Sequence, residues 1–133
     1  MKAISSKRVK GMNLGSIVRA VDNSGAKITK ITGVKRGKSK KGRQIGCGVG
    51  DWVKVSVRKG NPDMLGKLFD AIIVRQKKPF KRKTGERVMF EENGVALLKD
   101  EKGNPKGTLI RGPVAREVQE RFPQVAKIAQ TIV

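Results

Sequence analysis

Two stretches of the 133-residue sequence are dense in lysine and arginine, the side chains that neutralise phosphate groups. Six of the nine residues in 35–43 are basic and none is acidic, and these are Lys35, Arg36, Lys38, Lys40, Lys41 and Arg43. Seven of the thirteen residues in 75–87 are basic, against the single acid Glu86, and these are Arg75, Lys77, Lys78, Lys81, Arg82, Lys83 and Arg87. Smaller clusters are formed by Lys7, Arg8 and Lys10, and by Arg58 and Lys59. A single charged run is usually a solvated face, but two runs with so few acids nearby favour contact with a polyanion.

The composition of the whole chain points the same way. Lysine and arginine number 31 against 11 acids, which gives a formal net charge of +20 and favours a nucleic acid or another anionic surface as partner. Aromatic residues make up only 4%, so we expect recognition of phosphates and RNA shape rather than base stacking. Phe80, inside the second basic run, is open to two interpretations: a platform for one base or an anchor for the root of a hairpin.

Residues that would support catalysis or a metal site are scarce. There is no histidine, and Cys47 is the only cysteine, so a disulfide within the chain and a cysteine metal cluster are excluded. The segment 37–39 resembles the end of a phosphate-binding loop, but Thr32 stands where that motif needs glycine. The G-x-G-x-G run of 46–50 leads into a strand and predicts a turn where backbones approach closely. We expect no enzyme activity, no cofactor and no metal.

The acidic pairs Glu91–Glu92 and Asp100–Glu101 are interpreted as solvated surface groups rather than a Mg²⁺ or acid–base site. With further acids and bases they give the last third of the chain a mixed charge, which suits contact with proteins or with RNA at single points. The first ten residues lack an apolar run, and no stretch is long and apolar enough to cross a bilayer. These features predict a cytosolic protein without a signal peptide or membrane contact.

Short apolar runs separated by turns predict a mainly β fold, a small closed or nearly closed barrel. The predicted strands are 16–21, 26–34, 52–57, 68–74 and 94–98, the second with irregular spacing typical of a bulge. In 52–57, Val53, Val55 and Val57 share one face and Trp52 lies on the other. Thr84 and Gly85 predict the tip of a projecting basic hairpin near 75–90.

The hydrophobic period changes at Pro113, which suits the first turn of a helix. Val114, Val118 and Phe122 then form one helical stripe, and Val125, Ile128, Ala129 and Ile132 form a second after Pro123. The sequence therefore predicts one domain over 1–133. It has an N-terminal extension at 1–12, the barrel at 13–110 and two short helices within 111–133.

Five ordered blocks resemble the universal ribosomal protein L14 family of the large subunit. The blocks are AVDNSGAK at 20–27, GVGD at 48–51, AIIVRQKK at 71–78, FEENGV at 90–95 and GTLIRGPVARE at 107–117. The similarity runs from about residue 11 to the end of the sequence, and its wording is closer to the archaeal and eukaryotic branch. The 35–43 loop is richer in lysine than that family pattern, and 119–133 matches it loosely.

The resemblance implies a five-stranded β-barrel that is a structural constituent of the large ribosomal subunit and binds its rRNA through the basic residues named above. It implies contact with the neighbouring ribosomal proteins L3 and L24e, and with the anti-association initiation factor 6. It also places Thr108, Arg111, Arg116 and Lys127 at the subunit interface, in bridges to small-subunit rRNA. A second hypothesis is a free-standing barrel that coats DNA or RNA, as a chromatin or chaperone-like protein would.

Overall fold

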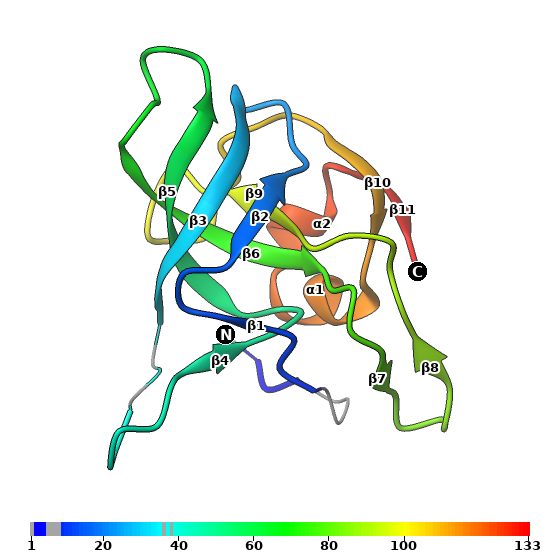
Figure 1. Ribbon diagram of the computed structural model, residues 1–133. Helices are drawn as coiled ribbons and strands as arrows, with labels where there is room; N and C mark the ends of the chain where they lie inside the picture. The colour runs from blue at the N-terminus through cyan, green and yellow to red at the C-terminus, as the bar shows by residue number, and fades with distance from the viewer. Residues whose placement is uncertain (1, 5–8, 36, 38) are drawn as a thin grey trace.

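A computed structural model describes residues 2–4, 9–35, 37 and 39–133 of the chain. Five strands close into a barrel in the order β2, β3, β5, β6, β9. Their bounds are Ile17–Ala20 for β2, Ala26–Val34 for β3, Trp52–Gly60 for β5, Leu68–Arg75 for β6 and Gly94–Leu97 for β9. Neighbours are antiparallel except β2 and β9, which pair in parallel and close the barrel. The predicted mainly β fold with a five-stranded barrel is confirmed (Figure 1).

The alternation of side chains along the strands explains the barrel interior. Val53, Val55 and Val57 are at most 1% exposed, and they pack with Ile31, Ile73 and other apolar groups in one cluster. The predicted bulge in β3 is also confirmed, since its pairing register with β5 shifts between Ile31 and Gly33. One end of the molecule carries two smaller antiparallel pairs. These are β1 (Met12–Asn13) with β4 (Gly46–Cys47), and β7 (Phe80–Lys81) with β8 (Arg87–Val88).

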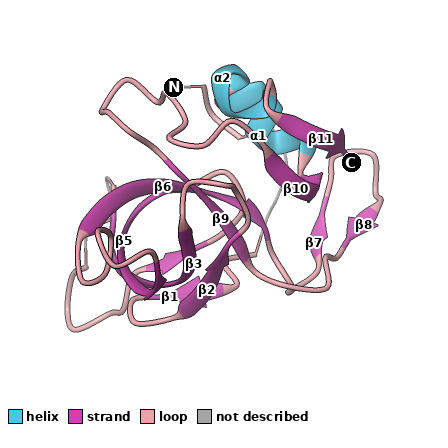
Figure 2. Ribbon diagram, turned by 90° about the horizontal axis from the view of Figure 1, so that it is seen from above, coloured by secondary structure: helices cyan, strands magenta, loops and turns pink. Residues whose placement is uncertain are grey.

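The C-terminal segment forms a second unit on the outside of the barrel (Figure 2). It consists of β10 (Ile110–Val114), α1 (Arg116–Arg121), α2 (Pro123–Ala126) and β11 (Ala129–Ile132). Its apolar side chains share a separate cluster with Trp52, Ile72 and Val74, which point outward from the barrel strands. Trp52 therefore lies on the opposite face from Val53, as predicted, and yet is buried. None of the helices in the described part of the chain is long and apolar enough to span a membrane.

Two short helices are present as predicted, but both are shorter than the sequence pattern indicated. Pro113 does not begin a helix: it lies in strand β10, which the backbone of Arg111 and Ala115 ties to Val21 and Val74 of the barrel. The pattern over 128–132 was also misassigned, because β11 pairs there in parallel with β10. Hydrogen bonding to the barrel and to a neighbouring strand outweighs the local preference of these residues.

The turn between β2 and β3 connects the barrel to the C-terminal unit. Asp22 accepts a hydrogen bond from the backbone N–H of Leu97 at 2.9 Å and one from the Ser24 hydroxyl at 2.7 Å. Asn23 Oδ1 accepts from the Thr108 N–H at 2.7 Å, and Asn23 Nδ2 donates to Thr108 Oγ1 at 2.8 Å. Aspartate and asparagine side chains in such turns commonly cap their own backbone. Here they also hold the loop that leads into β10.

The pKa values of Asp22 and Asp100 should be shifted in opposite directions from the ordinary value for aspartate. Burial raises the pKa of Asp22 despite its hydrogen bonds, whereas hydrogen bonds led by that from Asn104 lower the pKa of Asp100. The contribution of Asp22 to stability is therefore greatest below its ordinary pKa and is lost as pH rises through the raised value. That of Asp100 is present above its ordinary pKa and is lost as pH falls through the lowered value. Carboxyl-carbon NMR titration should find Asp22 protonating first as pH falls, and the reverse order would contradict this placement.

Candidate nucleic-acid interface

The loop between β3 and β4 and the β7–β8 hairpin project from the same end of the molecule, with the chain that leads into β1 between them (Figure 1). Gln76 fixes this arrangement: its Nε2 donates to the carbonyl oxygens of Val9 at 2.7 Å and Lys78 at 2.9 Å. The exposed cations gathered here are called the basic end, and they are Lys10, Lys35, Lys40, Lys41, Arg43, Lys77, Lys78, Lys81, Lys83 and Arg87. The predicted site residues Lys7, Arg8, Arg36 and Lys38 lie outside the described residues.

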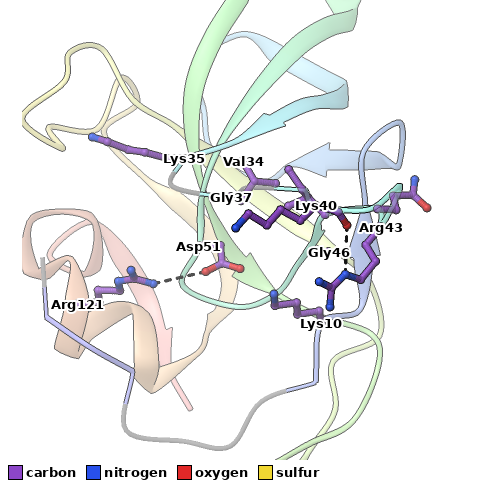
Figure 3. Close-up of a pocket in the computed structure, with 11 residues that line it drawn as sticks. Lys10, Val34, Lys35, Gly37, Lys40, Arg43, Gly46, Asp51 and Arg121 are labelled. Carbon is purple, nitrogen blue, oxygen red and sulfur yellow. Dashed lines mark hydrogen bonds and ion pairs between the residues drawn. The ribbon is translucent and has the colours of Figure 1, made fainter.

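A hollow of about 720 Å³ opens at the basic end beside the 35–43 loop. Its charged lining is Lys10, Lys35, Lys40, Arg43 and Arg121 against one acid, Asp51. Figure 3 shows Asp51 facing Arg121, 3.5 Å away, while Lys10 and Lys40 flank the same space. Because the Asp51 carboxylate is already engaged by Arg121 and by the Gly48 N–H, the lining keeps a positive excess that suits an anionic group.

Lys35 extends away from the other cations of the hollow (Figure 3). Its Nζ lies 4.0 Å from the centroid of the Trp52 ring, a cation–π contact between the loop and the first residue of β5. Trp52 also meets Phe122 edge to face at 6.0 Å. The beginning of the basic loop is thereby attached to the core that joins barrel and C-terminal unit.

The glycine run at 46–50 serves the fold rather than a ligand. The N–H groups of Gly48, Val49 and Gly50 donate to Asp51 Oδ2, Gln76 Oε1 and the Ile73 carbonyl, at 2.9, 3.1 and 2.8 Å. With these donors used internally, the run is a tight turn, as its glycine spacing predicted. Cys47 is buried. The described residues contain no group of three or more His, Cys, Asp or Glu side chains that could hold a metal ion.

Arg75 and Arg82 do not belong to the exposed cations, although both lie in the basic run 75–87. The Arg75 guanidinium donates to Glu92 at 3.0 Å and to the Arg111 carbonyl, and burial lowers its pKa. Arg82 Nε and Nη2 meet the two carboxylate oxygens of Glu117 at 2.9 and 3.3 Å. Sequence reasoning placed both arginines among phosphate ligands. That assignment stays a prediction; in the structure both side chains are buried, and each pairs with an acid of the protein itself.

Of the aromatic side chains, Trp52, Phe80, Phe90 and Phe122 are buried, and Phe69 is half-buried beneath Lys106. Phe80 is 1% exposed, which decides between its two interpretations in favour of an anchor for the hairpin root.

The acids of the Glu91–Glu92 and Asp100–Glu101 pairs are not simply solvated: Glu92 binds Arg19 and Arg75, and Asp100 caps a turn through Lys102 and Asn104. Sequence reasoning did not single out Glu117, which is 4% exposed and pairs with Arg82, because only its burial distinguishes it from other acids.

Two further sets of predicted residues lie away from the basic end. Arg58 and Lys59 are exposed near the opposite end of β5 (Figure 1). Thr108, Arg111, Arg116 and Lys127 are exposed on the C-terminal unit. Thr108 is held by Asn23, and the backbone of Arg111 is held by Val21. Arg116 lies beside Glu117 in α1, and its backbone N–H donates to the Val133 oxygen that Arg82 also contacts.

Comparison with known proteins gives one consistent result. The sequence profile of the family described as ribosomal protein L14p/L23e matches residues 11–133. The chain is 50% identical to the large ribosomal subunit protein uL14 of Nanoarchaeum equitans, over 100% of both chains. It is 48% identical to the protein of the same name from Methanocorpusculum labreanum and 42% identical to that from Halobacterium salinarum, again over 100% of each chain.

Glu92 allows a comparison of a buried and an exposed arginine on one carboxylate. Arg75 lies 3.0 Å from one carboxylate oxygen of Glu92, and its side chain is 8% exposed. Arg19 lies 3.3 Å from the other oxygen, and its side chain is 72% exposed. Arg75→Met should lower the free energy of unfolding by about 2–4 kcal/mol, because it leaves the Arg111 carbonyl and Glu92 without their buried donor. Arg19→Met should cost less than about 1 kcal/mol. Urea titration measures both, and equal losses would mean that burial of Arg75 does not matter.

Proposed function

Because the chain belongs to the ribosomal protein L14p/L23e family, we propose that it binds large-subunit rRNA through its basic end and contributes to bridges between the subunits. Family membership makes it a structural constituent of the large ribosomal subunit, of the archaeal type, in the ribosomes of the cytoplasm. It is not an enzyme.

The observation that carries the rRNA proposal is the gathering of ten exposed cations at one end. Four of them line a hollow in which Asp51, the one acid among the described lining residues, is already paired. Each cation that meets a phosphate releases a condensed counterion, so binding gains free energy that falls with salt concentration. No aromatic ring is fully exposed, which favours recognition of backbone and shape over base stacking. The exposed Arg58 and Lys59, at the opposite end, are proposed as a secondary contact.

Thr108, Arg111, Arg116 and Lys127 are proposed to face the small subunit. These four side chains are distinct from the exposed cations of the basic end, although α1 itself contacts the hairpin through Glu117. One molecule could therefore bind large-subunit rRNA and still present this surface. Ribosomal proteins L3 and L24e and the anti-association initiation factor 6 are proposed as protein partners. The mixed charge of the last third of the chain suits contact with proteins, or with RNA at single points.

Removal of two cations from the hollow should change the salt dependence of rRNA binding. Lys10→Gln with Lys40→Gln should reduce the slope of log K against log salt by about 0.7–0.9 for each phosphate that is no longer neutralised. Binding to protein-free large-subunit rRNA, titrated at several salt concentrations, measures this slope. The matched control, Lys99→Gln with Lys102→Gln, removes the same charge from exposed lysines elsewhere. An equal change in both variants would contradict a site at the basic end.

Charge reversal on the C-terminal unit should separate subunit joining from assembly. Arg111→Glu with Arg116→Glu should weaken joining by about tenfold or more, because like charges would then face small-subunit rRNA. Incorporation into large subunits should stay unchanged, since both side chains lie outside the basic end. Sucrose-gradient profiles of purified variant subunits report both quantities. Loss of incorporation would instead place these residues against large-subunit rRNA.

A further inference from the structure

The β7–β8 hairpin is too small to hold its own shape. Each strand has two residues, with the pairs Phe80–Val88 and Lys81–Arg87. The turn adds backbone hydrogen bonds from Arg82 N–H to Glu86 at 2.9 Å and from Gly85 N–H to Arg82 at 2.9 Å. Isolated two-stranded hairpins are marginally stable even when longer. Yet this hairpin carries Lys81, Lys83 and Arg87, three exposed cations that repel one another.

Arg82 connects the hairpin to the C-terminal unit. It stands at the start of the hairpin turn, and its side chain reaches Glu117 in the first turn of α1. Nε to Oε1 is 2.9 Å and Nη2 to Oε2 is 3.3 Å, a two-pronged contact in which the side chains are 8% and 4% exposed. Such a paired geometry fixes orientation as well as distance.

A third group completes the arrangement. Arg82 Nη2 also donates to the Val133 carbonyl at 2.7 Å, and the same oxygen accepts the Arg116 N–H at 3.0 Å. The hairpin, the start of α1 and the residue after β11 therefore meet at one guanidinium. We call Arg82, Glu117 and the Val133 carbonyl the clasp. Phe80, Val88 and Phe90 pack beneath it with Val118, so apolar burial and the ion pair act on the same segment.

We propose that Arg82 is a positioning residue: through the clasp it fixes the hairpin on α1 so that the exposed hairpin cations meet rRNA already in place. This inference rests on the rRNA-binding function proposed above. It assigns Glu117, an acid, a favourable role in binding a polyanion. A hairpin that becomes ordered only on binding loses conformational entropy at that step, which weakens the affinity for rRNA. Because the clasp orders the hairpin in the free protein, this cost does not arise on binding.

The test uses the opposed predictions of charge and of positioning. Glu117→Gln makes the protein one unit more positive, so electrostatics alone predicts tighter rRNA binding, as does a role for Arg82 as phosphate ligand. The clasp predicts weaker binding, by about tenfold, because the two-pronged contact between Arg82 and Glu117 is lost and the hairpin is no longer fixed on α1. Affinity of the full chain for protein-free large-subunit rRNA at fixed salt is the measured quantity. Unchanged or tighter binding by Glu117→Gln would overturn the proposal.

Glu86→Gln is the matched control, because it removes one exposed acid from the same hairpin without touching the clasp side chains. It should bind as tightly as the unsubstituted chain or more tightly, and a loss equal to that of Glu117→Gln would overturn the proposal. Failure of the unsubstituted chain to bind rRNA at all would instead overturn the proposed function itself.

Hydrogen exchange gives a readout that does not depend on RNA. In Glu117→Gln the amides of Arg82 and Gly85 should exchange faster while those of the barrel strands keep their protection, and unchanged exchange would overturn the proposal.

Where Glu117→Gln fails to fold, the charge-swapped pair Arg82→Glu with Glu117→Arg decides the matter. Recovery of folding and rRNA affinity supports the clasp, and absence of recovery contradicts it.

Discussion

Repulsion among 31 basic side chains, opposed by only 11 acids, is the constraint on which the rest of this structure depends. The fold meets it by closing five strands into a barrel that packs apolar side chains inside, and by packing a second apolar cluster between the barrel and the C-terminal unit. Most cations are then left on the surface, many of them concentrated at one end. A polyanion that binds the folded protein shields the repulsion among these cations and so stabilises the fold. The cations that destabilise the free protein are therefore the same ones that would bind rRNA.

The arginines divide into two groups by burial, and the division explains how the basic end keeps a defined shape. Arg75 and Arg82 are inside, each paired with an acid and with a backbone carbonyl of the C-terminal unit. They hold β6 and the hairpin against that unit. The neighbouring lysines, with compact and strongly hydrated charges, remain outside. The Arg75 and Arg82 guanidinium groups form internal connections, whereas the exposed lysines, together with Arg43 and Arg87, are the cations proposed to meet phosphates.

Sequence reasoning succeeded where a local pattern is tied to a local structure. The valine alternation of 53–57 identified the barrel interior, the irregular spacing of 26–34 a bulge, and Thr84–Gly85 the hairpin tip. It failed where a distant partner decides. Nothing near Pro113 indicates that β10 will pair with β11 and the barrel. Likewise, the many cations around Arg82 give no sign that it pairs with Glu117, 35 residues away. The exposed site residues follow from composition, whereas the buried pairs require the fold.

The central claim is that this protein is an integral part of the large ribosomal subunit, held by its basic end. The most direct measurement is sedimentation of cell lysate through sucrose gradients at low and at high salt, with detection of this protein in each fraction. The account predicts that it sediments with large subunits and with joined ribosomes, and that it stays with them at high salt. Sedimentation at the top of the gradient, or complete release by salt, would contradict the account and favour a free nucleic-acid-binding barrel.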